Sequence, residues 1–62
     1  MSYIKITWFS TLYNRETSCN VFGDIDFGMN GGAFGATFKS GGRGYFVHAE
    51  HIIKIEHIEI ND

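Results

Sequence analysis

Apolar residues alternate with polar ones near the start of the chain. In the sequence SYIKITWF, residues 2–9, Ile4, Ile6 and Trp8 occupy every second position. A period of two is typical of a β-strand with one buried face, because successive side chains point to opposite sides. The pattern therefore predicts a first strand with these three side chains in the core.

A second alternating segment covers residues 18–25. It follows turn-forming residues centred on positions 14–16. Cys19, Val21 and Ile25 share one face of this segment, which predicts a second strand. Cys19 is then a small buried apolar side chain, and this interpretation is favoured over a nucleophile paired with a histidine.

Two glycine clusters divide the middle of the chain. GMNGG, residues 28–32, contains the Asn-Gly pair that tight hairpins favour, and KSGGRG, residues 39–44, predicts a second turn. Between them AFGATF, residues 33–38, predicts a third strand, and its small residues indicate the close approach of another backbone. YFV, residues 45–47, predicts a short fourth strand.

The end of the chain predicts one turn and a last strand. HAEH, residues 48–51, is too short for a helix of its own and indicates a single 3₁₀ turn. In IIKIEHIEI, residues 52–60, the isoleucines of the two halves are one position out of phase, so a bulge near His57 is expected. A C-terminal helix over residues 49–60 is the alternative, which the density of β-branched residues disfavours.

These elements predict one all-β domain over residues 1–62. The expected architecture is a single five-stranded small barrel of the SH3 or Sm type, with a short 3₁₀ turn before the last strand. A domain of this size buries only about 60% of the surface of its unfolded chain. Cys19 is the only cysteine, which excludes an intrachain disulfide. We therefore expect a homo-oligomer, because subunit contacts would enlarge the core and cover the edge strands.

Charge and hydropathy narrow the classes of partner. The formal net charge is −2, and the five basic residues are scattered along the chain. Binding to nucleic acid without sequence preference depends on clustered basic residues, so the composition counts against that class. No apolar run approaches the roughly 18 residues of a membrane span, and residues 1–10 lack the apolar core of a signal peptide. We expect a cytoplasmic protein with no membrane segment.

Two segments resemble the Sm-like family. IDFGMN, residues 25–30, is similar to its first motif, in which an aspartate stands four residues before an asparagine that follows a methionine. VHAEHIIKI, residues 47–55, is similar to its second motif, where an aliphatic residue precedes Arg-Gly or His-Ala. The resemblance covers about half of the chain. It implies a ring of protomers whose last two strands pair edge to edge, with Asn30 and His48 lining a pocket for an RNA base.

Two features depart from the Sm-like pattern. Gly28 occupies the position of the family's base-stacking residue, and Phe27 stands one place earlier. The family's N-terminal helix is also replaced by a strand pattern that starts at Tyr3. These departures concern the RNA site more than the architecture.

The histidines and acidic residues are candidates for chemical sites. Zinc accepts imidazole and carboxylate ligands, and the candidates are His48, His51, His57, Glu50 and Glu56. Surface or interface histidines are the favoured interpretation, and histidines meeting at an interface would make assembly sensitive to pH. Asp24 and Asp26 share a strand face, as some general acid–base pairs do, but a partner-binding or solvated face is favoured. No catalytic residue, metal or cofactor is expected.

The aromatic residues carry the main functional signal. Ten aromatic side chains cannot all be buried in 62 residues, so some must form an exposed patch of the kind that marks interfaces. We expect a non-enzymatic regulator or inhibitor that acts by protein–protein contact and self-associates, in the style of the small regulators of phages and mobile elements. Its expected partner-binding residues are Phe22, Asp24, Asp26, Phe27, Glu56 and Glu59. The alternative is an Sm-like oligomeric ring that binds RNA or a small nucleotide through Phe27, Asn30, Arg43 and His48.

Overall fold

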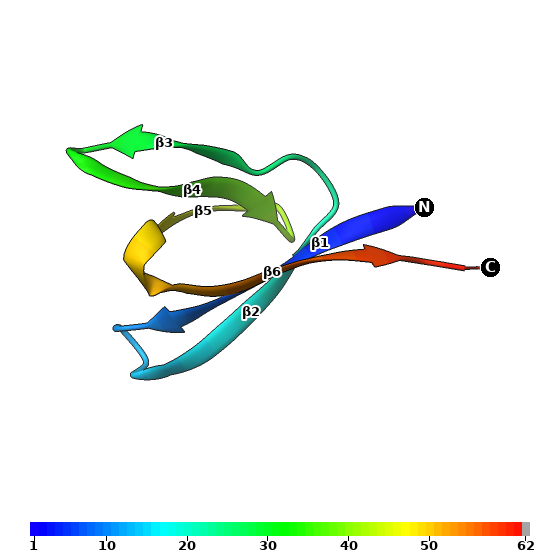
Figure 1. Ribbon diagram of the computed structural model, residues 1–62, viewed down its shortest axis with the longest axis horizontal. Helices are drawn as coiled ribbons and strands as arrows, with labels where there is room; N and C mark the ends of the chain where they lie inside the picture. The colour runs from blue at the N-terminus through cyan, green and yellow to red at the C-terminus, as the bar shows by residue number, and fades with distance from the viewer. Residues whose placement is uncertain (62) are drawn as a thin grey trace.

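A computed structural model describes residues 1–61 of the chain. These residues form six strands and one 3₁₀ turn (Figure 1): β1 Ser2–Ser10, β2 Arg15–Val21, β3 Asp26–Asn30, β4 Ala33–Ser40, β5 Arg43–His48, η1 Ala49–His51 and β6 Ile52–Glu59. The first sheet has the order β2-β1-β6 and the second sheet has the order β3-β4-β5, both antiparallel. The all-β prediction is confirmed. Within residues 1–61, no helix is long and apolar enough to cross a membrane.

The prediction of a five-stranded barrel is wrong in the number of strands and in the closure of the barrel. The second strand ends at Val21 instead of reaching Ile25, and the chain bends at Phe22 and Gly23 before β3 begins at Asp26. The predicted turn over residues 28–32 is also too long, because its first three residues belong to β3. A sixth strand results, and in the described part of the chain the two sheets pair only internally, so the barrel stays open.

The first strand and the core follow the alternating pattern. Ile6 is fully buried and Trp8 nearly so, while Ile4 packs against them. Among residues 1–61 the buried core consists of three residues from each sheet: Ile6, Trp8, Val21, Ala36, Phe38 and Val47. Cys19, which was predicted to be buried, is only partly buried and packs against this core. The Trp8 and Phe38 rings pack edge to face with their centroids 5.8 Å apart, and this aromatic contact joins the two sheets.

Both glycine clusters form tight hairpins, as predicted. Gly31 and Gly32 connect β3 to β4, and Gly41 and Gly42 connect β4 to β5. All four have positive φ angles between 60° and 85°. Positive φ at both central residues is the requirement of a type I′ turn, whose twist matches that of the flanking strands. Glycine meets this requirement without a steric penalty.

Gly35 confirms the predicted close approach of another backbone. A Cβ atom at this position would collide with the carbonyl oxygen of Val47 on β5 and would lie 2.8 Å from the Phe46 ring. The neighbouring glycine on β3, Gly28, pairs with Gly35 but has open space around its own Cα. Of these two paired glycines, only Gly35, on the central strand β4, therefore has no room for a side chain.

The last strand is present, but its irregularity lies elsewhere than predicted. The 3₁₀ turn and β6 confirm the expected turn and strand and exclude the helical alternative. The β1–β6 register shifts between Thr7 and Trp8, where β6 contributes one extra residue, Ile53. The prediction of a bulge near His57 is therefore wrong. The out-of-phase isoleucines arise because Ile58 lies on the sheet face opposite to Ile55, where it pairs with Tyr3.

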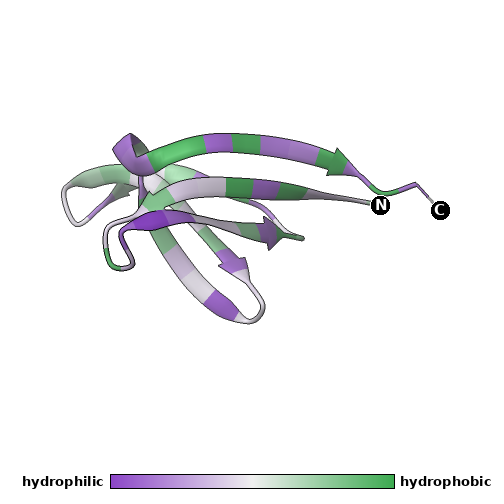
Figure 2. Ribbon diagram, turned by 90° about the horizontal axis from the view of Figure 1, so that it is seen from below, coloured by the Kyte–Doolittle hydropathy of each residue, from purple (hydrophilic) through white to green (hydrophobic). Residues whose placement is uncertain are grey.

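The paired ends of β1 and β6 extend beyond the rest of the molecule. The Ile60 N–H donates to the Met1 carbonyl oxygen at 2.8 Å, so the two ends of the described chain lie side by side (Figure 1). Figure 2 shows the alternating hydrophobic and polar bands along this projecting part. The longest dimension of the molecule is consequently 41 Å, about twice the other two.

Candidate partner-binding site

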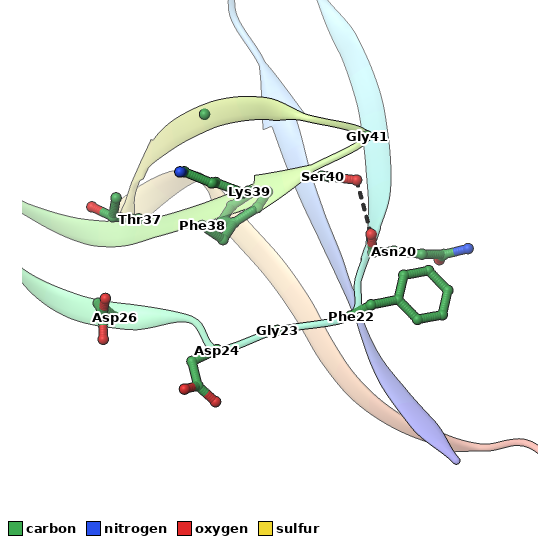
Figure 3. A pocket seen from close by; sticks show the side chains of 11 residues that line it. Asn20, Phe22, Gly23, Asp24, Asp26, Thr37, Phe38, Lys39, Ser40 and Gly41 are labelled. Carbon is green, nitrogen blue, oxygen red and sulfur yellow. Dashed lines mark hydrogen bonds between the residues drawn. The ribbon is translucent and has the colours of Figure 1, made fainter.

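A hollow of about 420 Å³ opens beside the second half of β4 (Figure 3). The β3–β4 ladder starts at the pair Asp26–Thr37, and β4 continues to Ser40 with no strand on that side in the described chain. The bent segment from Phe22 to Ile25 runs past this stretch of β4 without pairing to it. The Ser40 hydroxyl donates to the Asn20 carbonyl oxygen at 2.8 Å and closes one end of the hollow.

Phe22 stands at the bend that creates the hollow. The residue is 68% exposed, and the centroid of its ring lies 5.2 Å from the centroid of the Tyr3 ring. Along β2, Val21 faces the core, so the next residue faces the opposite side and cannot enter the core. The contact with Tyr3 places the ring against the first sheet, and the chain bends at Phe22 and Gly23.

Asp24 and Asp26 are the acidic residues of the hollow. Both are exposed and line the hollow, Asp24 on the bent segment and Asp26 at the start of β3, where it pairs with Thr37 (Figure 3). Neither forms an ion pair with any residue in the range 1–61. Lys39 lines the opposite side, yet its ammonium group is not within ion-pair distance of either carboxylate. The two negative charges are therefore free for a ligand.

The main chain of Lys39 faces the same hollow. In a two-residue hairpin the residues that flank the turn exchange hydrogen bonds, so Ser40 directs its N–H and C=O toward Arg43 on β5. Main-chain groups alternate in direction along a strand, and those of Lys39 consequently point away from β5. No backbone hydrogen bond outside the ladders reaches Lys39 in the part of the chain that is described. The hollow thus contains one free donor and one free acceptor of a sheet edge.

The six expected partner-binding residues fall into three places. Phe22, Asp24 and Asp26 line the same hollow, although their side chains point in different directions (Figure 3). Phe27 lies on the opposite face of β3 from Asp26 and is 54% exposed. Glu56 and Glu59 lie on β6, where Glu56 forms an ion pair with Lys54 at 3.5 Å. The structure therefore brings half of the set together.

Phe27 belongs to a separate apolar patch at the tip of the β3–β4 hairpin. Its other members are Met29 and Phe34, which are paired across the hairpin and more than half exposed. These side chains continue the core-facing side of the second sheet beyond the point where the first sheet covers it. The expectation of exposed aromatic residues agrees with this patch and with Phe22.

The four residues expected to bind RNA or a nucleotide occupy two faces of the second sheet. Asn30 and His48 share one face near the β3–β4 hairpin, because their partners on β4 are Ala33 and Gly35. Phe27 and Arg43 lie on the other face, and Arg43 stands at the far end of β4, opposite Ser40. One protomer alone does not bring these four side chains together.

The histidines do not gather at one point. The rings of His48 and His51 lie 5.8 Å apart, whereas His57 is opposite Ile4 on the projecting part of β6. Across residues 1–61, no group of three or more histidine, cysteine or acidic side chains is arranged to hold a metal ion. His51 approaches Glu50 at 3.7 Å, which is a contact of neighbours at the surface.

The β4 side of the hollow could not be predicted from the sequence. Thr37 lies in the predicted third strand and Lys39 in the second predicted turn, and neither position indicates a binding role. Alternation along β4 places both on the face away from the core, but a polar face is common to most exposed strands. The missing strand beside them depends on the bend at Phe22, for which the local sequence carries no signal other than Gly23.

Comparisons with protein-family models, with curated proteins and with solved structures found no match to this chain. The resemblance of residues 25–30 and 47–55 to the Sm-like family therefore stays a prediction. The geometry of the hollow is the strongest guide to function.

Proposed function

We propose that this protein is a non-enzymatic regulator or inhibitor that acts by capturing a partner protein. The hollow beside β4 binds an extended, basic segment of that partner. The observation that carries this proposal is the meeting of unpaired carboxylates, an exposed aromatic ring and a free sheet edge at one opening.

Each part of the hollow has a distinct task in this proposal. The carboxylates of Asp24 and Asp26 accept hydrogen bonds from an arginine or lysine side chain, and charge-assisted bonds are the stronger kind. The exposed Phe22 ring, which points away from the two carboxylates (Figure 3), offers an apolar contact to a neighbouring residue of the segment. The main chain of Lys39 pairs with the backbone of the segment, as in other cases where a peptide adds a strand to a sheet edge.

A binding function suits the openness of the site. The hollow faces solvent along the bent segment, so water reaches both carboxylates (Figure 3). Catalytic carboxylates work best where water is excluded and their charge is held in a low-dielectric environment. Recognition of a charged segment makes no such demand.

The test is selection of peptides from a random display library by the immobilised protein. The unmodified protein is expected to enrich peptides with arginine or lysine, and the variant Asp24→Asn/Asp26→Asn is expected to lose that enrichment. The matched control is Glu16→Gln/Glu50→Gln, which removes the same charge from exposed positions away from the hollow. Equal enrichment by both double variants, or no basic preference at all, would overturn the proposed site.

We also propose that the fold is an opened form of the SH3- or Sm-like small barrel. The central position of β1, the two short hairpins and the 3₁₀ turn before β6 support this relationship. A cytoplasmic location belongs to the same proposal, since a lone cysteine is compatible with a reducing compartment.

A second candidate function is the Sm-like ring that binds RNA or a small nucleotide. It is favoured by one observation, the presence of Asn30 and His48 on the same face and at the same end of the second sheet. Asn30→Ala would then weaken nucleotide binding and leave the oligomer intact. Binding that is unchanged by both Asn30→Ala and Arg43→Ala would remove this candidate.

A further inference from the structure

β6 is a long and uncovered sheet edge. It has eight residues and, within residues 1–61, pairs only with β1. Ile53 and Ile55 on this strand are 53% and 44% exposed. Unpaired edges of this length are templates for pairing with another chain unless they are protected.

One hydrogen bond shows which residues of β6 direct their N–H and C=O groups toward β1 and which direct them to the free edge. The Ile60 N–H donates to the Met1 carbonyl oxygen, so Ile60 directs its main chain toward β1. Alternation along the strand gives Ile58 and Glu56 the same direction. Ile55, His57 and Glu59 consequently present their N–H and C=O groups to the free side.

The side chains of β6 are complementary to a second copy of the same strand in one register. A two-fold axis perpendicular to a sheet pairs residues that share a face. An axis at Lys54 would place the two Lys54 side chains opposite each other, and an axis at Glu56 would do the same with the two Glu56 side chains. Each arrangement is destabilising, because like charges face one another. An axis at Ile55 places Lys54 of each copy opposite Glu56 of the other.

We propose that two copies of this chain pair antiparallel through β6, about a two-fold axis at Ile55. The two Ile55 residues form the central hydrogen-bonded pair, since the main chain of each faces the free edge. Two Lys54–Glu56 pairs flank it on the outer face of the sheet. The result is a continuous six-stranded sheet in the order β2-β1-β6-β6-β1-β2.

The charged residues of β6 therefore select a register. Lysine and glutamate on an edge strand usually block edge-to-edge association. Here they destabilise the two-fold registers centred on Lys54 and on Glu56, and they stabilise the register centred on Ile55. The dimer leaves the hollow beside β4 uncovered, because that hollow is bounded by β2 and β4 and not by β6. Failure of the dimer would therefore leave the proposed partner-binding site untouched.

The experiment is a charge swap read by sedimentation equilibrium. Lys54→Glu and Glu56→Lys each place like charges opposite one another in both flanking pairs, so each variant alone is expected to dimerise about tenfold or more weakly. An equimolar mixture of the two variants restores opposite charges and is expected to regain the dimer. The control Glu16→Gln, on β2, should dimerise like the unmodified protein.

A second measurement covers the case in which a variant does not fold, since Glu56→Lys also faces Lys5 on β1. Amide exchange on the unmodified protein is expected to slow at Ile55 and His57 as protein concentration rises. A monomer at all concentrations, a closed ring of five or more subunits, single variants that dimerise normally, or amides insensitive to concentration would each overturn the proposal.

Discussion

Individual residues in this small domain differ sharply in how much space surrounds them. Gly28 and Gly35 stand opposite each other on β3 and β4. A side chain at Gly28 would meet open space, whereas one at Gly35 would meet the backbone and the Phe46 ring of β5. Two glycines that look alike in the sequence therefore make different contributions to the fold.

Gly35→Ala is expected to lower the free energy of unfolding by about 1–3 kcal/mol. The added methyl group forces β4 and β5 apart at the Val47 carbonyl, which is backbone and cannot turn aside. Urea denaturation followed by tryptophan fluorescence measures the change. Gly28→Ala is the matched control, and its effect should be within about 0.5 kcal/mol of zero. An equal loss from both variants would contradict the close approach at Gly35.

The elements of the fold were predictable where the signal is local. Ile4, Ile6 and Trp8 define the buried side of β1, and the glycine pairs define the two hairpins, because periodicity and positive φ depend on adjacent residues. The division of the second strand was not predictable. The alternation that includes Cys19 and Val21 continues to Ile25, and the contact of Phe22 with the distant Tyr3 is not visible in that local pattern.

The same distinction applies to the candidate site. Phe22, Asp24 and Asp26 share one short segment, so their nearness to one another was predictable from the sequence. The contribution of Lys39 arises from a hairpin that aims its main chain at a gap between the sheets. A gap of this kind is a property of two elements together, so no single segment of the sequence indicates it.

The hairpin that joins β4 to β5 allows a stabilising change. Gly41 has a φ of 60° at the first turn position, which asparagine tolerates better than other side chains. Gly41→Asn should raise the free energy of unfolding by about 0.4–1 kcal/mol, because asparagine restricts the unfolded chain more than glycine does. Gly41→Val should lower it, since a β-branched residue resists positive φ. Thermal unfolding of the two variants checks the sign, and a gain from valine would contradict the turn geometry.

The whole molecule depends on a core of very few side chains. Folded domains are stable by roughly 0.05–0.15 kcal/mol per residue, which is only about 3–9 kcal/mol for a chain of this length. Replacing a fully buried isoleucine by alanine costs about 2–5 kcal/mol. A single substitution in the core is therefore comparable with the entire stability of the domain.

Ile6→Ala tests this dependence at the centre of the molecule. Ile6 is fully buried between the sheets, so the variant is expected to be largely unfolded at 37 °C, with loss of its near-ultraviolet circular dichroism. Leu12→Ala removes similar apolar volume from a side chain that is 82% exposed, and it should unfold at the same temperature as the original protein. Because a dimer through β6 would add stability by mass action, both variants should be compared at low and high protein concentration. An Ile6→Ala variant that stays folded at every concentration would show that the two sheets are held together by more than their shared core.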